Sequence, residues 1–250
     1  MRGILMIEDL VWQTVDGYKT QTRRTGGLES VNIGKDEEDN DIEISDLFEL
    51  VRYNDTHAKF TGKHDSLNEM YCYPRYKIDE VLYIKEPILS AVYKGWLRVG
   101  GTVNIGSTRY YYDLRANDRD GELKQLGITK SNKLYMKAAD ARFFIRITGI
   151  KCERLLSISE ADCEAEGIEK GCCFFDGEWG NIFGWRDYAV FPVKADTDPY
   201  DIYGFPPTNK RSSFFSLFRF ANKITAKKDI GNPWVWAYEY EYLKEYKLAE

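Results

Sequence analysis

The segment GYKTQTRR, residues 17–24, holds the densest group of side chains that could bind a ligand or do chemistry. It combines three cations, Lys19, Arg23 and Arg24, with the hydroxyls of Thr20 and Thr22. Ammonium and guanidinium groups beside short hydroxyls are what a phosphate or the polar edge of a base requires. The same pattern is also typical of a solvated basic strand edge, so the residues alone leave both interpretations open.

Short elements must position this segment. Apolar residues recur at roughly helical spacing over residues 3–16, and Gly17 follows where a glycine commonly ends a helix. The pattern therefore predicts a short helix ending near Asp16. A polar, acidic stretch comes after the motif, and we expect one helix within it, around residues 45–52.

Strands and helices alternate along the rest of the chain. Apolar or alternating runs predict four strands, at residues 81–85, 110–114, 142–148 and 234–240. Strands interleaved with helices, without a βαβ rhythm, predict the α+β class with a small mixed barrel.

Two later helices are marked by their caps. Ser159 is a favourable N-cap with Asp162 three residues later, so a helix should run to Glu166 and stop at Gly167. A second helix, rich in phenylalanine, should begin at a cap formed by residue 212 or 213, both of which are serines.

The composition is that of a globular protein, with 43% hydrophobic residues and a net charge of −5. This charge argues against coating long nucleic acid through counterion release, although a local basic cluster can still bind a ligand with few phosphates. We expect a cytoplasmic protein without a membrane partner, because apolar runs are short and acidic residues come early. Five cysteines without a CxxC pair, and two histidines without zinc spacing, predict free thiols, no metal and no cofactor.

Four segments, in the same order, resemble the ASCH group of the PUA-like superfamily, of the kind common in phages and prophages. They are GYKTQTRR (17–24), DEVLYIKEP (79–87), RFFIRITGIKCERLLSISEADCEAEGI (142–168) and NPWVWAYEYEYL (232–243). The resemblance implies one domain over residues 1–250, a PUA-like (ASCH) small mixed β-barrel with flanking helices. Large loop insertions would fall at about 25–75, 88–135 and 171–211. The chain departs from the family pattern at residues 79–80, where Asp-Glu replaces the usual Gly-Asp, and around residues 138–140.

The resemblance implies a cleft that accepts RNA, DNA or a modified nucleoside. On this reading its lining residues are Lys19, Thr20, Arg23, Arg24 and Glu86. Glu86 ends an apolar strand, so its carboxylate would pair with one of the motif cations, accept from the amine of a base, or form a structural salt bridge.

A small bacterial subgroup is similar to amidohydrolases that remove the acetyl group of acetylated cytidine with a Lys, a Thr and a Glu. Matching the motif puts these roles on Lys19, Thr22 and Glu166. Thr22 would attack the amide carbonyl, Lys19 would serve as its base or hold the oxyanion, and Glu166 would orient the amine or shuttle a proton. Residues 19 and 22 face opposite sides of a straight strand, so this mechanism requires a bend after Gly17.

Three functions follow from these observations. The first is a nucleic-acid or modified-nucleotide binding protein with a cationic cleft built around GYKTQTRR. The second is a hydrolase that acts on an acylated nucleoside, or a nuclease that acts on a phosphodiester. The third is a phage accessory protein without a nucleotide ligand, whose acidic residues 29–49 and insertions bind a protein partner. The oligomeric state stays open.

Overall fold

The computed structural model describes residues 1–35, 38, 40–63, 69–86, 88–91, 101–105, 108–112, 128–175, 178–188, 209–224 and 230–246. The chain divides into two compact units, each assembled from separate stretches of sequence. The first unit comprises Met1–Val15, Val81–Ile145 and Tyr242–Glu250, and the second comprises Asp16–Glu80 and Arg146–Glu241.

The first unit contains short strands and one helix. In chain order its elements are β1 (Arg2–Leu5), α1 (Glu8–Val15), β8 (Val81–Lys85), β9 (Ile88–Ala91), β10 (Gly101–Ile105), β11 (Thr108–Tyr112), β12 (Ile128–Lys130), and the 3₁₀ turns η2 (Lys133–Tyr135) and η3 (Ala138–Asp140). Strands β1 and β8 pair in parallel, and β11, β10, β9 and β12 form a separate sheet in that order. Ile4, Leu82 and Ile84 are fully buried, which explains why these short strands form.

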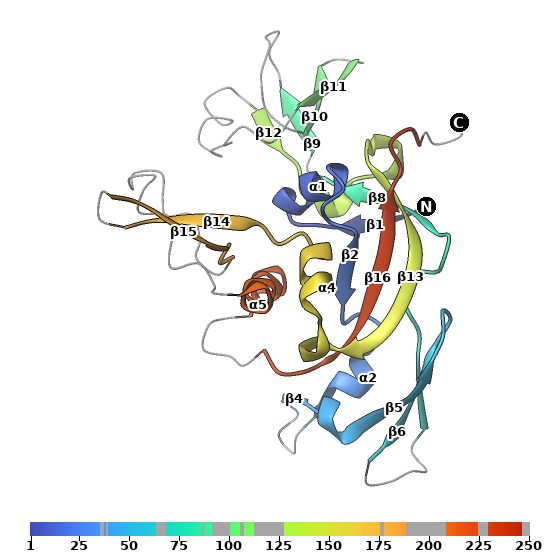
Figure 1. The fold of residues 1–250 in the computed structure, drawn as a ribbon. Helices are drawn as coiled ribbons and strands as arrows, with labels where there is room; N and C mark the ends of the chain where they lie inside the picture. The colour runs from blue at the N-terminus through green and yellow to red at the C-terminus, as the bar shows by residue number, and fades with distance from the viewer. Residues whose placement is uncertain are drawn as a thin grey trace. The chain divides into compact units, whose positions relative to one another are not determined.

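The second unit contains most of the chain. Its elements are β2 (Gln21–Arg24), α2 (Glu29–Asn32), β3 (Ile33–Lys35), β4 (Asp41–Glu43), η1 (Ser45–Leu47), β5 (Phe48–Tyr53), β6 (Ala58–Gly62), β7 (Glu69–Cys72), most of β13 (Phe144–Arg154), η4 (Leu155–Ser157), α4 (Glu160–Ala165), β14 (Lys170–Phe175), β15 (Glu178–Trp185), α5 (Lys210–Ala221) and most of β16 (Trp234–Tyr242). The long, curved strand β13 runs beside β16, and β2 pairs with the other edge of β16 (Figure 1).

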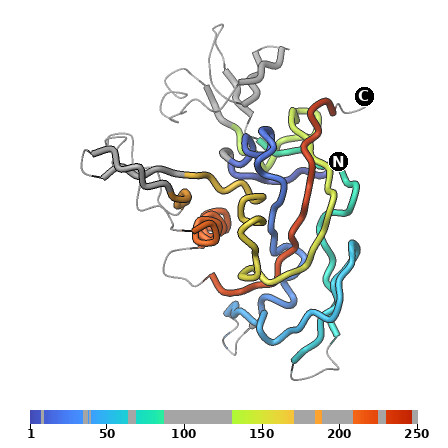
Figure 2. The backbone as a smooth tube through the Cα atoms, in the orientation of Figure 1, coloured from blue at the N-terminus to red at the C-terminus, as the bar shows by residue number. Residues whose placement is uncertain are grey.

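The core of the second unit is built by large side chains of β16 and its neighbours. Trp236 and Tyr238 are fully buried, and the Tyr238 ring meets Tyr76 edge-on at 5.2 Å. Farther along β16, the Phe60 ring packs edge-on against Trp234 at 5.1 Å. Helix α4 lies between β2 and α5, which brings the C-terminal end of α4 to the chain just before β2 (Figure 2).

Most of the predicted elements are confirmed. Helix α1 ends at Val15, and Gly17 follows with a left-handed φ of 83°. The strands predicted at 81–85, 142–148 and 234–240 are β8, β13 and β16, the last two longer than expected. Strand β11 matches the start of the predicted strand 110–114, whose last two residues lie outside the described part of the chain.

Two predictions of local structure are wrong. The helix expected around residues 45–52 is a 3₁₀ turn followed by β5, because the segment FELVRY pairs antiparallel with β6. Helix α5 begins three residues earlier than expected, because the Asn209 side chain accepts from the backbone N–H of Ser212. Ser213 instead donates its hydroxyl to the carbonyl of Arg186.

The α+β class is confirmed, whereas a closed barrel is not found. Within the described residues, the strands form open sheets of two to five strands. Much of the predicted insertions at 88–135 and 171–211 lies outside the described residues.

Candidate functional site

The chain that leads into β2 is held against helix α4. The backbone N–H of Thr20 donates to the carbonyl of Ala165 at 2.8 Å, and the carbonyl of Thr20 accepts from Tyr240 at 2.9 Å. The left-handed backbone at Gly17 lets the chain turn into this position without a steric cost from Cβ. Consequently, Lys19 lies under the end of α4 rather than on the molecular surface.

The Lys19 ammonium is fully enclosed and fully bonded. Its Nζ donates to the Gln21 carbonyl at 2.7 Å, to the Glu166 carbonyl at 2.7 Å and to Glu166 Oε2 at 2.8 Å. These three acceptors match the three donors of an ammonium group. Burial lowers the pKa of Lys19 from its ordinary value, and the adjacent Glu166 carboxylate opposes that shift.

Gly167 makes room for this lysine. It ends the α4 region with a φ of 80°, as the sequence predicts for a helix stop. A Cβ at this position would also lie 2.8 Å from the Cβ of Lys19. Besides ending the helix, Gly167 therefore leaves space for the Lys19 side chain to pass beneath the helix end.

Arg23 joins the same cluster from β2 and is 5% exposed. Its Nη1 donates to Glu166 Oε1 at 3.1 Å and to Gln21 Oε1 at 3.0 Å. On the other side, its Nε donates to Glu153 Oε1 at 2.8 Å. Glu166 thus bridges the two buried cations, one on each carboxylate oxygen, and we call Lys19, Arg23 and Glu166 the buried brace.

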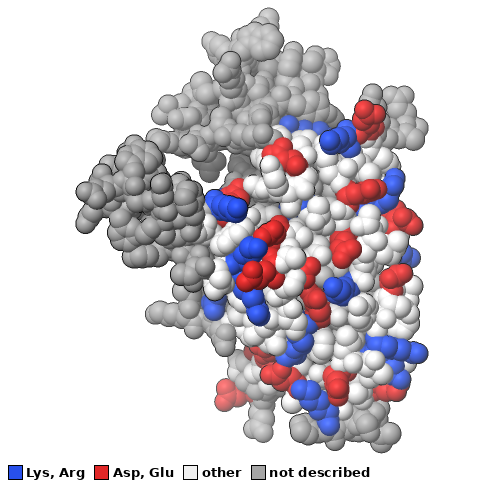
Figure 3. Space-filling view, viewed as in Figure 1, with Lys and Arg blue, Asp and Glu red and all other residues white. Residues whose placement is uncertain are grey.

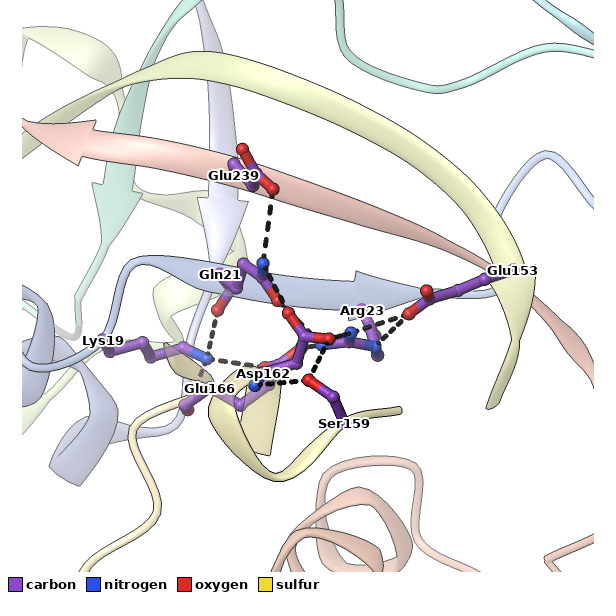
Figure 4. Close-up of polar contacts among 8 residues, drawn as sticks. All are labelled: Lys19, Gln21, Arg23, Glu153, Ser159, Asp162, Glu166 and Glu239. Atoms are coloured by element: carbon purple, nitrogen blue, oxygen red, sulfur yellow. Dashed lines mark hydrogen bonds and ion pairs between the residues drawn. The ribbon is translucent and has the colours of Figure 1, made fainter. Parts of the chain in front are cut away.

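Three carboxylates that are more exposed than Glu166 flank the brace and Gln21 on different sides, and we call them the carboxylate rim: Glu153, Asp162 and Glu239 (Figure 4). The Gln21 amide nitrogen donates to Asp162 Oδ1 at 3.0 Å and, more weakly, to Glu239 Oε1 at 3.4 Å. Asp162 also accepts the Ser159 hydroxyl at 2.7 Å. The Gln21 amide therefore fixes the rim relative to the buried brace.

The charges of this site are not arranged as a cationic cleft. Three carboxylates contact the two cations, Glu239 bonds to Gln21 beside them, and the cations are buried together with Glu166. The carboxylates of the rim are the more accessible layer, with 15% of the Glu153 side chain and 22% of the Asp162 side chain exposed. A ligand that reaches this site meets carboxylate oxygens before it meets Lys19 or Arg23.

The structure brings together two of the three predicted catalytic residues. Lys19 and Glu166 are in direct contact, as the proposed mechanism requires. Thr22, on β2, is buried opposite Tyr238 of β16. Within the described residues, its hydroxyl bonds to neither Lys19 nor Glu166. The strand alternation accounts for this separation, since Gln21 and Arg23 face the brace while Thr22 faces the other side of the sheet.

The remaining predicted ligand residues have different surroundings. Thr20 has an exposed side chain, and Arg24 is half-buried opposite Trp236. Glu86 belongs to the first unit. There Arg142 donates from Nη2 to Glu86 Oε1 at 2.7 Å and from Nε to Glu86 Oε2 at 2.8 Å. The Arg142 guanidinium in turn lies 4.4 Å from the centroid of the Phe143 ring. For Glu86 the structural salt bridge, one of the three predicted alternatives, is therefore the one observed.

Sequence reasoning missed the rim and Gln21. The period of two along β2 is a signal for Gln21, because it places this residue on the same face as Arg23. Asp162 was interpreted only as part of a helix cap, and it does accept the hydroxyl of Ser159. Glu153 and Glu239 lie on strands far apart in sequence, and no local pattern connects them with the motif.

Protonation of the Asp162 carboxylate at low pH should weaken its stabilising contacts within the rim. Burial, the largest influence, raises the pKa of Asp162, but hydrogen bonds from Ser159 and Gln21 and the charge of Arg23 together hold it below the ordinary value of 3.8. A lowered pKa in the folded state means that the stabilisation is complete above the unfolded value and disappears as the pH falls through the folded value.

We therefore expect Asp162→Asn to reduce the free energy of unfolding at pH 7. Below pH 4, the difference in free energy of unfolding between the variant and the unmutated protein should become smaller. Urea unfolding of both proteins at several pH values measures this. An unchanged difference down to pH 2.5 would show that the Asp162 charge does not stabilise the fold.

The described surface has no broad field of one charge on the face drawn in Figure 3, where basic and acidic side chains are interspersed. The described residues contain no group of three or more metal-ligating side chains placed to hold an ion. No helix in this part of the chain is long and apolar enough to cross a membrane. A pocket of about 390 Å³ in the second unit is lined by none of the predicted site residues; its walls are Glu43, Asp46, Leu156, Ile230, Gly231 and Asn232.

Comparison of the chain with protein-family models, with curated proteins and with solved structures finds no match.

Proposed function

We propose that the protein binds a nucleobase, as a nucleoside or within a nucleotide, by hydrogen bonds from the base to the carboxylate rim. The observation that carries this proposal is the Gln21 amide, which ties Asp162 and Glu239 to the buried brace. A rim held in this way offers several acceptors in a fixed arrangement. Exocyclic amines of bases are donors that pair with Asp and Glu carboxylates.

The charge layout favours the base over the phosphate of such a ligand. A phosphate that approaches the rim meets like charge, which is unfavourable when desolvated. The two cations are already bonded to acceptors within the protein. Recognition by amine donors of the ligand avoids both obstacles.

We also propose the finer fold assignment, a PUA-like domain of the ASCH kind. Its support is that each of the four segments that carry the resemblance contributes a strand: β2, β8, β13 and β16. The third segment continues into helix α4, whose Glu166 contacts Lys19 of the first segment. Three of the four segments, 17–24, 142–168 and 232–243, supply residues of the site that we propose.

Isothermal titration with cytidine and uridine tests the proposed function. Cytosine presents an amine at the position where uracil presents a carbonyl oxygen, so we expect cytidine to bind at least about tenfold more tightly. Glu239→Gln should remove most of this preference. Glu241→Gln, an exposed carboxylate on the same strand, is the matched control and should retain it. Equal affinity for both nucleosides would overturn the proposal.

A second candidate is hydrolysis of an acylated nucleoside, which the 2.8 Å contact between Lys19 Nζ and Glu166 Oε2 favours. The mechanism would require Thr22 to reach the same ligand, and Lys19 to release at least one of its three acceptors. Turnover of N4-acetylcytidine by the protein and by Thr22→Ala tests it. Turnover that is unchanged in Thr22→Ala would exclude Thr22 as the nucleophile, and turnover that is lost would support it.

A further inference from the structure

The sheet β5–β6–β7 carries cations and an aromatic ring in one row on its exposed face. Strand register places Arg52 opposite Lys59, and Lys59 opposite Tyr71, so the three side chains lie next to one another across the sheet. Arg52 is exposed. The Tyr71 residue is 45% exposed, and the Lys59 ammonium lies 5.8 Å from the centroid of its ring. The same ammonium pairs with the Glu69 carboxylate, so Arg52 is the cation of this row that forms no ion pair with another described residue.

The opposite face of this sheet is anchored in the core of the second unit. Ala58, Phe60 and Cys72, which alternate with the exposed residues, are at most 2% exposed. Phe60 packs against Trp234 of β16. The exposed row is thus mounted on a fixed support, which reduces the entropy lost when a ligand orders its side chains.

Two further rings extend the row past the strand ends. The His57 ring lies 5.7 Å from the ring of Tyr71 and 6.3 Å from that of Tyr73, centroid to centroid. Tyr73 is 62% exposed. His57 is held in place by a turn in which the Asn54 side chain accepts from its backbone N–H at 2.9 Å. The result is a line of ring faces beside two cations.

We propose that this surface, formed by Arg52, His57, Lys59, Tyr71 and Tyr73, binds single-stranded nucleic acid. Exposed aromatic rings stack on bases irrespective of sequence, and the exposed Arg52 guanidinium beside them meets a phosphate. A single strand fits better than a duplex, because only unpaired bases present their faces to side chains. The proposal deepens the proposed function and rests on it for the class of ligand, since it supplies neighbouring nucleotides of a strand with a second contact surface.

The test uses fluorescence anisotropy of labelled U12 and dT12 with the full-length protein. We expect binding to at least one of the two strands, and a loss of affinity of about tenfold or more in both Tyr71→Ala and Tyr73→Ala. Tyr71→Phe and Tyr73→Phe keep the ring and should bind within about twofold of the unmutated protein. Tyr135→Ala, at a tyrosine that is 82% exposed in the first unit, should bind normally. A comparison of U12 with dT12 shows whether the strand is RNA or DNA.

Two outcomes would overturn this inference: binding to neither strand, or alanine variants that bind as tightly as the unmutated protein. Failure of the proposed function is distinguishable from both. If cytidine and uridine bind equally but the tyrosine variants lose affinity for U12 or dT12, the rim proposal falls and the stacking surface stands. If the tyrosine variants retain strand binding while Glu239→Gln abolishes the preference for cytidine, the reverse holds.

Discussion

Lys19→Ala is expected to lower the free energy of unfolding by about 3–5 kcal/mol. The substitution removes the ammonium that donates to Glu166 Oε2 and to the backbone carbonyls of Gln21 and Glu166. A buried carboxylate that loses one partner costs much more than an exposed ion pair contributes. Arg23 still contacts Glu166 Oε1, so the effect should lie near the lower end of this range.

Urea unfolding monitored by tryptophan fluorescence measures this change. The matched control is Lys151→Ala, because Lys151 is an exposed lysine outside the brace, and its loss should change the stability by less than about 0.5 kcal/mol. A cost below about 1 kcal/mol for Lys19→Ala would mean that the ammonium is not the structural centre of this motif.

Gly27→Ala is expected to destabilise the protein by about 3 kcal/mol or more. Gly27 has a left-handed φ of 89°, and a Cβ at this position would lie 2.3 Å from the carbonyl oxygen of Tyr73. The obstacle is backbone rather than the end of a flexible side chain, so either the loop after β2 or the chain at Tyr73 must move. The substitution therefore adds a collision to the strain of an alanine in the left-handed region.

The neighbouring glycine supplies the control. A Cβ on Gly26 would have its nearest neighbour, Glu29 Oε1, at 4.0 Å, so Gly26→Ala should change the midpoint of thermal unfolding by only a few degrees. Equal midpoints for the two alanine variants would show that the close approach of Gly27 to Tyr73 does not occur in solution. Movement at Tyr73 also predicts weaker strand binding by Gly27→Ala, because Tyr73 belongs to the stacking surface.

The local signals in the sequence predicted the elements that position the site. Gly17, Ser159 and Gly167 mark helix ends because their roles depend on backbone conformation and nearby hydrogen bonds, which are properties of a few adjacent residues. The pairing of Lys19 with Glu166 was foreseen only through the family resemblance, since 147 positions separate the two residues. No periodicity can reveal a contact over such a distance.

The errors have physical causes of the same kind. The segment FELVRY contains residues that suit a helix, and only its partner strand β6 and the buried Phe60 make it a strand. At Asp79, where the sequence departs from the pattern that it resembles, the backbone has a φ of 62°. An aspartate tolerates this left-handed conformation better than most residues.

Burial of Lys19 and Arg23 changes what the basic motif can bind. On a solvated surface, Lys19 and Arg23 would form the cationic cleft that their spacing suggests. In the second unit they lie beside carboxylates that take up their donors, and their role becomes the support of the rim. We therefore propose that the protein recognises a ligand by the hydrogen-bond donors of its base and not by its phosphate.

The most direct measurement compares the affinities of cytidine and cytidine 5′-monophosphate for the unmutated protein by isothermal titration at low and high salt. We expect cytidine to bind at least as tightly as the monophosphate, and added salt to leave the affinity for cytidine nearly unchanged. A monophosphate that binds tenfold or more tightly than the nucleoside at low salt, with an advantage that salt removes, would contradict it and restore the cationic cleft.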